Sequence, residues 1–474
     1  MSNIRMNFLY QSAYQIFVII LPIITAPYVS RVLGAEGVGT FSFTFSVANY
    51  FVLFSMLGIN NYGNRKVAEV RDDRGKLNVT FSSIFSLHFT ISFLVLIAYT
   101  IYILIFVRDN SILSIISVVY IIAAMLDINW FFFGMEQFKI TVMRNLIIKI
   151  LTAILIFILV RDKNDLDIYV AIMAIGTFIS QSMVWLVVKK YVGFVKPKWT
   201  DIVVHLKPML ILFIPTLSIS LYKLMDKIML GVMSDKTQVG LFDNAEKIIN
   251  IPMGLITAVG TIMLPRMTNL LTTTEFSKVE KYIANSMKYV LIVSLGWFFI
   301  ISSVAPKFAP VFFGEEFLGS GVIMQGLAIT IPFIAFANVI RTQYLIPNRF
   351  DAIFVKSVLI GAGINIITNL LLIPHYQALG ATIATICAEI SVCLLQCWAV
   401  RRSLSILRYV RESFYFILLG VTMFILIRIL SVNISTSIFS LTIELVVGGL
   451  IYAVGTLLYF IKKKDSMILS IIKK

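Results

Sequence analysis

The chain has 474 residues, of which 59% are hydrophobic and only 14% charged, and its mean hydropathy is +0.93. Soluble domains carry about 25% charged residues, so this composition excludes an ordinary soluble fold and predicts an all-α polytopic membrane protein. The formal net charge of +16 would suggest nucleic acid binding in a soluble protein. Here the basic residues gather in alternate loops, which argues against nucleic acid as a partner.

Apolar stretches of about 20 residues predict fourteen transmembrane helices. The first stretch follows Arg5 but continues past signal-peptide length without a clear cleavage site, so we expect it to be retained. In chain order the predicted spans are 8–30, 37–61, 79–107, 111–134, 138–160, 166–190, 206–231, 237–262, 282–305, 318–346, 350–374, 378–400, 411–432 and 437–461.

The distribution of Lys and Arg predicts the orientation of these spans. Most basic loop residues fall on one side, in the segments near 65–76, 139–144, 189–207, 266–288, 401–411 and 462–474, with Arg144 counted among them. The other side holds few basic residues, namely Arg31, Arg108, Arg161, Lys163, Lys236, Lys307 and Arg428. The positive-inside rule therefore predicts that both termini are cytoplasmic, and that the long polar connections 191–207 and 263–281 are cytoplasmic loops.

A short internal repeat suggests how the spans are grouped. The order Leu-Gly, Val-Gly, Phe occurs twice, in PYVSRVLGAEGVGTF at 27–41 and in DKIMLGVMSDKTQVGLF at 226–242. The first copy joins predicted spans one and two, and the second joins spans seven and eight, six spans later. Six is an even number, so the halves would share orientation as two six-helix lobes in a parallel pseudo-two-fold repeat. We predict an N-lobe at 1–195, a C-lobe at 196–405, and helices 13–14 with a basic cytoplasmic tail at 406–474.

Ionisable residues at membrane depth are the candidate functional residues, because each costs at least about 2.5–3.5 kcal/mol there. Most of them should therefore line a wet cavity or pair internally. Cys387, Cys393 and Cys397 share one apolar segment, so neither a disulfide scaffold nor a metal site is expected. The set is Asp127, Lys149, Lys223, Asp226, Lys227, Glu246, Lys247, Lys356, Glu389 and Glu444.

Structural interpretations compete with functional ones at these positions. Lys223 and Asp226 have the i, i+3 spacing of an intrahelical pair, and Lys227 is near enough to the helix end to extend to the interface. A purely structural network around Glu246 and Lys247 is as plausible as a functional one. Cavity lining is favoured for Lys149, since no acid lies within a helical turn. Glu389 is either a bonded structural acid or a titrating one, Glu444 suits a structural role, and Lys356 suits a cytoplasmic anchor.

With the nearby Arg31 and Arg341 added, the basic side chains outnumber the five acids, so a cavity that they line would attract an anion. Phosphate or diphosphate is the expected group, and acidic sugars are an alternative. We predict substrate-binding roles for Arg31, Lys149, Lys223, Lys227, Lys247, Arg341 and Lys356. The candidates for binding a coupling proton or sodium ion are Asp127, Asp226, Glu246 and Glu389.

Four residue patterns resemble the polysaccharide transporter family, the Wzx-type oligosaccharide flippases of the MATE-related (MOP) superfamily. They are P-x3-R-x-LG-x3-VG-x-F from Pro27, D-x2-W-x3-G-x-E-x-F from Asp127, D-x3-LG followed by VG-x-F from Asp226, and Q-x3-P-x-R from Gln343. Together with NLLLIPHYQALGATIAT at 369–385, they place the resemblance across the first twelve predicted helices.

The resemblance implies a secondary transporter that flips a lipid-linked (polyprenyl diphosphate) oligosaccharide from the cytoplasmic to the outer leaflet of a bacterial plasma membrane, for cell-surface polysaccharide biosynthesis. It implies two lobes around a central cavity, alternating access, no enzymatic reaction and no cofactor. Membrane lipids, a glycan polymerase and the polysaccharide assembly machinery are the implied partners.

Three alternatives have sequence features that separate them from this hypothesis. A MATE-like cation or drug antiporter should present an acidic cavity, whereas this one is basic. A peptidoglycan-precursor (lipid II) flippase would share the cationic cavity, but its distinguishing motifs are not evident. A membrane glycosyltransferase could use Asp165-Leu166-Asp167 to hold a metal ion, although a solvated charge run in an outer loop is favoured there.

Overall fold

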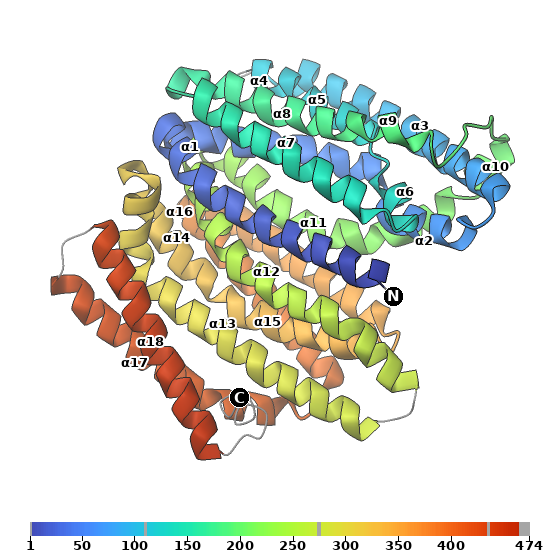
Figure 1. The fold of residues 1–474 in the computed structure, drawn as a ribbon. Coiled ribbons are helices and arrows are strands. Elements are labelled where there is room, and N and C mark those ends of the chain that lie inside the picture. Colours follow the sequence, from blue (N-terminus) through green and yellow to red (C-terminus); the bar gives the residue numbers. More distant parts are fainter. Residues whose placement is uncertain (1, 109–110, 273–275, 434–436, 464–474) are drawn as a thin grey trace. The chain divides into compact units, whose positions relative to one another are not determined.

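The structure is a computed structural model that describes residues 2–108, 111–272, 276–433 and 437–463 (Figure 1). Within the helices it leaves undescribed the side chains of 2–16, 19, 215, 218–219, 221–223, 271–272, 276–278 and 433. Throughout the described ranges every regular element is a helix. This confirms the all-α prediction.

The contacts within the chain define two compact units, residues 1–240 and 241–474. The predicted lobe boundaries after residues 195 and 405 stay predictions. The first unit contains α1 Ser2–Met56, α2 Ile59–Val70, α3 Arg74–Phe106, α4 Ser111–Ile116, α5 Val118–Met125, α6 Asn129–Gly134, α7 Phe138–Leu159, the 3-10 turn η1 Lys163–Asp165, α8 Leu166–Met183, α9 Trp185–Val188, α10 Trp199–Val203 and α11 Leu206–Met233.

The second unit takes all but the first turn of α12 and everything that follows it. Its elements are α12 Lys236–Thr272, α13 Phe276–Phe313, the 3-10 turn η2 Glu315–Phe317, α14 Leu318–Ala328, α15 Thr330–Ile340, the π-helix η3 Arg341–Leu345, α16 Asp351–Val400, α17 Ile406–Asn433 and α18 Ile438–Lys463. The polar connection predicted at 263–281 is largely helical, because α12 runs to Thr272 and α13 begins at Phe276, and its cytoplasmic side stays a prediction.

Eleven segments in the described ranges are long and apolar enough to cross a membrane. Two of them, Ile20–Val70 and Asp351–Val400, have 51 and 50 residues, about twice the length that one crossing needs. Both contain a residue with non-helical backbone angles, Gly34 (φ 71°) in α1 and Gln377 (φ 49°) in α16. The chain therefore bends at Gly34 and at Gln377, as expected between two spans, and the first segment breaks again at Leu57 and Gly58 before α2.

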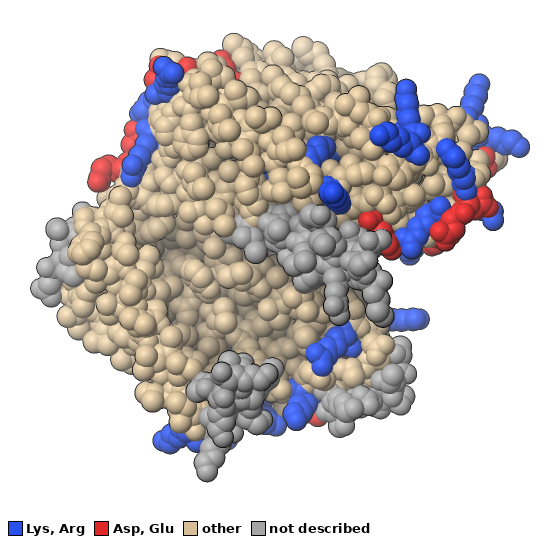
Figure 2. All heavy atoms as spheres, viewed as in Figure 1, with Lys and Arg blue, Asp and Glu red and all other residues tan. Residues whose placement is uncertain are grey.

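The placement of the charged residues on the first unit also fits a membrane protein. On the face of the first unit seen in Figure 2, Lys and Arg gather toward the ends of the long helices and the sides between them are mostly uncharged. Large apolar side chains such as Leu104, Leu155 and Ile179 are exposed on those sides. These sides are suited to contact lipid.

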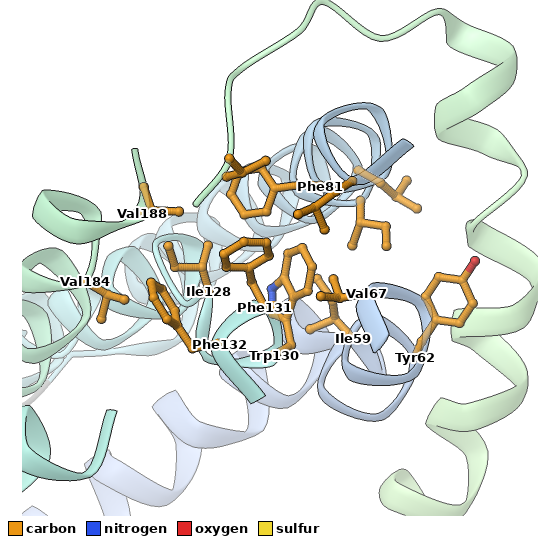
Figure 3. Packing of buried hydrophobic residues seen from close by; sticks show 14 of the residues in the cluster. Ile59, Tyr62, Val67, Phe81, Ile128, Trp130, Phe131, Phe132, Val184 and Val188 are labelled. Carbon is orange, nitrogen blue, oxygen red and sulfur yellow. The ribbon is translucent and has the colours of Figure 1, made fainter. Parts of the chain in front are cut away.

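At one end of the first unit, the short helices α2 and α6 pack against each other, and α2 and α10 both pack against α3 (Figure 1). Buried aromatic side chains form a cluster there, in which the ring of Phe81 from α3 contacts the rings of Trp130 and Phe131 from α6 (Figure 3). Gly63 lies against the Trp130 ring, with no room for a side chain. The predicted single span at 111–134 is thus three short helices, the last of which packs against α2.

The two copies of the sequence repeat contact each other within the first unit. A Cβ on Gly39 would lie 1.6 Å from the Lys236 carbonyl oxygen, and one on Gly240 would lie 2.1 Å from the Ala35 oxygen. When the two Val-Gly-x-Phe motifs are aligned, Gly39 matches Gly240 and Ala35 matches Lys236. The two contacts are therefore reciprocal, as a local two-fold axis would make them.

One buried ion pair joins the last two helices to the rest of the second unit. Lys307 of α13 lies 3.1 Å from the carboxylate of Glu444 in α18, which is fully buried, and also donates to the Ser431 carbonyl of α17. Burial of both charges is tolerated because they neutralise each other. This contact supports the structural interpretation of Glu444.

Gln377 offers a test of backbone strain at the bend in α16. Its angles of φ 49° and ψ −126° suit glycine and cost other residues about 1–3 kcal/mol. We expect Gln377→Gly to raise the unfolding free energy by about 1 kcal/mol, measured as a higher unfolding temperature of the detergent-solubilised protein. Gln396→Gly, in the regular part of the same helix, should lower it; the idea fails if both substitutions destabilise equally.

Candidate functional site

The turn between α5 and α6 is built by the Asp-x-x-Trp pattern. The Asp127 carboxylate accepts the backbone N–H of Asn129 at 2.8 Å, and the Trp130 indole donates to the Asp127 carbonyl at 3.2 Å. Trp185 of the neighbouring segment donates to the Leu126 carbonyl at 2.9 Å. These bonds satisfy backbone groups that the helix break would otherwise leave unpaired.

Beside this turn is a cavity of about 400 Å³ enclosed by α1, α6, α7 and α8. Its volume is in the range of small-molecule binding sites. Its polar lining consists mainly of neutral amides and hydroxyls, and its cationic member is Lys149. The polar residues are Thr25, Asn129, Asn145, Lys149, Thr152, Tyr169, Thr177, Ser180 and Gln181.

Lys149 is half-buried on α7 and lines the cavity, as the sequence predicted for it. Within the described part of the chain, its amine makes no ion pair or hydrogen bond. An ammonium group at membrane depth without a counter-charge is costly, so it requires water or an anionic ligand in the cavity.

Asp127 is not part of the cavity lining, but hydrogen bonds connect it to two residues that are, Asn129 and Gln181. Gln181 donates to its carboxylate at 3.0 Å, Asn129 donates to the Gln181 carbonyl at 3.1 Å, and Arg144 donates to the Asn129 carbonyl at 2.9 Å. Two amides thus connect the guanidinium to the carboxylate. This chain balances the charge of Asp127 within the protein.

The other predicted residues of the first unit lie outside the cavity lining. Arg31 is exposed on α1, one turn after Tyr28, whose hydroxyl donates to the Val160 carbonyl at the end of α7. Asp226 is buried and Lys227 half-buried on α11. The side chain of Lys223 lies outside the described residues.

In the second unit, Lys247 is neutralised by a residue that the sequence analysis did not select. Its amine lies 2.7 Å from the Asp243 carboxylate, one turn earlier on α12, and donates to Asn244 at 3.1 Å. Glu246 is half-buried on the same helix, and Lys356 is exposed near the start of α16. Arg341 lies over the Phe354 ring at 5.4 Å.

Glu389 is buried where the two halves of α16 pack together. Gly361 faces Val392, and Gln396 donates to Ser357 at 3.0 Å, so the halves run antiparallel in a fixed register. That register places Glu389 about level with Asn365, which accepts a hydrogen bond from Asn369 at 3.2 Å. A carboxylate beside amide groups fits either a structural acid or a proton site, as the sequence left open.

Sequence reasoning missed most of the cavity's polar lining. Asn129, Asn145 and Gln181 are neutral, so a search for intramembrane charges passes over them. The assignment of Arg144 to a cytoplasmic loop is wrong, because its side chain is only 6% exposed and bonds to Asn129 and Asn145. The i, i+4 spacing of Asn145 and Lys149 on α7 was the signal available.

The sequence model of the polysaccharide biosynthesis protein family matches residues 4–271. The chain belongs to this family. An O-antigen transporter of Shigella dysenteriae is 26% identical over 406 residues, which are 84% of this chain and 99% of that protein. A low-salt glycan biosynthesis flippase of Haloferax volcanii is 24% identical over 164 residues, 35% of this chain and 34% of that protein. The predicted resemblance to polysaccharide transporters is confirmed.

Among solved structures, the lipid II flippase MurJ in an inward closed conformation matches with a TM-score of 0.80. The match covers 97% of this chain and 100% of that one at 14% sequence identity. At this identity the likeness establishes that this polysaccharide biosynthesis family member shares the fold of that flippase, and nothing about its substrate.

Two membrane lysines should respond to substitution with opposite signs. We expect Lys149→Met to raise the unfolding temperature, because it removes a half-buried charge that no carboxylate balances. Lys307→Met should lower the unfolding temperature, with a loss of about 3–5 kcal/mol in the free energy of unfolding, because the substitution leaves the Glu444 carboxylate buried alone. Thermal unfolding in the same detergent measures both, and a Lys149→Met protein as unstable as Lys307→Met would show that Lys149 is structural.

Proposed function

We propose that the protein is a secondary transporter that flips a lipid-linked oligosaccharide from the cytoplasmic to the outer leaflet for cell-surface polysaccharide biosynthesis. The family match and the O-antigen transporter, which aligns over 99% of its own length, support the substrate class. The observation that carries the mechanism is the Lys149 amine, which lines a polar cavity without a counter-charge.

Moving a polar sugar head group across a membrane requires such a cavity. Sugar hydroxyls and a phosphorylated head group cannot cross about 30 Å of hydrocarbon unaided, because each desolvated polar group costs several kcal/mol. In the proposed mechanism the amides and hydroxyls of the cavity replace water around the sugar, and Lys149 meets the negative charge. The polyprenyl chain stays in lipid while the lobes alternate between inward and outward openings.

The proposed membrane topology has fourteen spans, with both termini in the cytoplasm of a bacterial cell. The eleven candidate segments become thirteen if the 51- and 50-residue segments each cross twice, and the 28-residue helix α11 supplies another span. The reciprocal contacts of Gly39 and Gly240 support a parallel repeat. Our assignment remains two six-helix lobes at 1–195 and 196–405, and helices 13–14 with a basic tail at 406–474, of which 464–474 lie outside the described residues.

The contacts in the structure change the order in which we rank the predicted residues as candidates for substrate binding and ion coupling. Lys149 is our first candidate for head-group contact, and Arg31, Lys223, Lys227, Arg341 and Lys356 stay secondary candidates. Lys247 ranks below them because Asp243 already neutralises it. For a coupling proton or sodium ion, Glu389 and Asp226 rank above Glu246, and Asp127 ranks last because Arg144 balances it through two amides.

The alternative functions receive less support from these contacts. A cation antiporter needs an available acid in its cavity, whereas the available charge here is an amine. In the Asp165-Leu166-Asp167 segment, the Asp165 carboxylate accepts the backbone N–H groups of Arg161 and Asp162, so it closes a turn. That role accounts for the Asp-x-Asp pattern without a metal-dependent glycosyltransferase.

Replacement of the chromosomal gene tests the proposed function. We expect Lys149→Gln to reduce surface glycan about 10–100-fold, because a charge-assisted hydrogen bond contributes about 1.5–3 kcal/mol. The lipid-linked glycan should accumulate on the cytoplasmic side, and Lys149→Arg should export at least partly. Surface glycan is measured by whole-cell labelling and inner-leaflet glycan by protection from added glycosidase. Normal export by Lys149→Gln at equal protein levels would contradict the proposal.

A further inference from the structure

Asn145 is held in one orientation by the Arg144 guanidinium, which can only donate to its oxygen. Its Oδ1 atom accepts hydrogen bonds from Arg144 Nη2 at 2.8 Å and Arg144 Nε at 3.2 Å, and from the Ser180 hydroxyl at 2.9 Å. A guanidinium has no acceptor, so a flipped amide would oppose N–H to N–H. The chemistry therefore fixes which end of the Asn145 amide is nitrogen.

The nitrogen end of this amide is the part left for the cavity. Asn145 belongs to the cavity lining, and none of the described residues accepts a hydrogen bond from its Nδ2 atom. Lys149 follows one helical turn later on the same face of α7, about 6 Å along the axis. An amide NH2 and an ammonium group, both donors only, therefore occupy adjacent turns of one wall.

The surrounding charges leave this pair of donors with one net positive charge. Arg144 also donates to Asn129, and the amide chain through Gln181 ends on the Asp127 carboxylate. Arg144 and Asp127 thus form an amide-bridged ion pair that is neutral as a whole. The uncompensated charge of the cavity is that of Lys149.

We propose that Asn145 Nδ2 and Lys149 Nζ form a two-point clamp for a single oxyanion group, a phosphoryl or carboxylate group, on the α7 wall of the cavity. Arg144 is a positioning residue, because it holds the Asn145 amide with its donors toward the ligand. The clamp rests on the proposed function only for the identity of the molecule that carries the oxyanion. Neutral sugar hydroxyls would meet the remaining amides and hydroxyls of the lining.

Equilibrium binding of inorganic phosphate and of acetate to the purified full-length protein tests the clamp. Asn145→Asp keeps the oxygen acceptors for Arg144 and Ser180 but replaces the two N–H donors with lone pairs and a negative charge. We expect it to bind the preferred ion at least about 10–100-fold more weakly than the natural protein, without a lower unfolding temperature. Asn145→Ala, which adds no charge, should also bind more weakly.

Ser180→Ala is the matched control, because Ser180 touches the same oxygen but gives no donor to the ligand. It should change binding by no more than about two-fold. Tighter binding of phosphate than of acetate identifies a phosphoryl ligand, and tighter binding of acetate identifies a carboxylate ligand. If Asn145→Asp and Asn145→Ala bind both ions as the natural protein does, or if the natural protein binds neither, the clamp is wrong.

The positioning role of Arg144 has its own readout. Arg144→Lys should weaken ion binding when Asn145 is present and have no further effect in the Asn145→Ala background, whereas a general structural role would weaken ion binding in both backgrounds.

A transport measurement distinguishes failure of the clamp from failure of the proposed function. If the protein binds phosphate through Asn145 but moves no glycan, the proposed function fails and the clamp stands. If Lys149-dependent export proceeds normally in Asn145→Asp, the clamp fails and the function stands.

Discussion

A positive side chain at membrane depth must meet a carboxylate, water or a ligand, and this constraint separates the intramembrane lysines into two kinds. Lys307 and Lys247 each lie within about 3 Å of a largely buried carboxylate, which neutralises the charge; the Lys307 pair joins two helices, and the Lys247 pair lies within one helix. Lys149 lies in a cavity wall with no carboxylate beside it. The same residue type is therefore neutralised within the protein in two places and left without a carboxylate in a third, where we propose that it binds a ligand.

The sequence motifs of the family have mostly structural explanations in this chain. Gly34 permits the bend within α1, and Gly39 and Gly240 permit the backbones of two helices to touch. In the second motif, Asp127 and Trp130 close the α5–α6 turn, and Glu136 forms an ion pair with Arg71 at 2.7 Å. The motifs identify the scaffold, while Lys149, the proposed ligand-binding residue, lies outside all four patterns.

The second unit retains features that packing alone does not explain. Gln343 is fully buried in the π-helix η3, and within the described chain neither polar atom of its amide has a hydrogen-bond partner. An unsatisfied buried amide costs about 1–3 kcal/mol, and π-helical turns occur often at functional sites. This combination marks η3 as a place where a second arrangement of the helix would recover lost hydrogen bonds.

The sequence by itself determined the membrane class, the approximate positions of most helices and the selection of Lys149, because hydrophobic length and isolated charge are local properties of the chain. Only the tertiary structure decided which charges are free. Arg144 and Asp127 are 17 positions apart, yet amides from α6 and α8 join them, and Asp243 neutralises Lys247 across one helical turn. Neutral side chains such as Asn145 acquire a function only from the groups that fix their orientation, and a linear sequence does not contain that geometry.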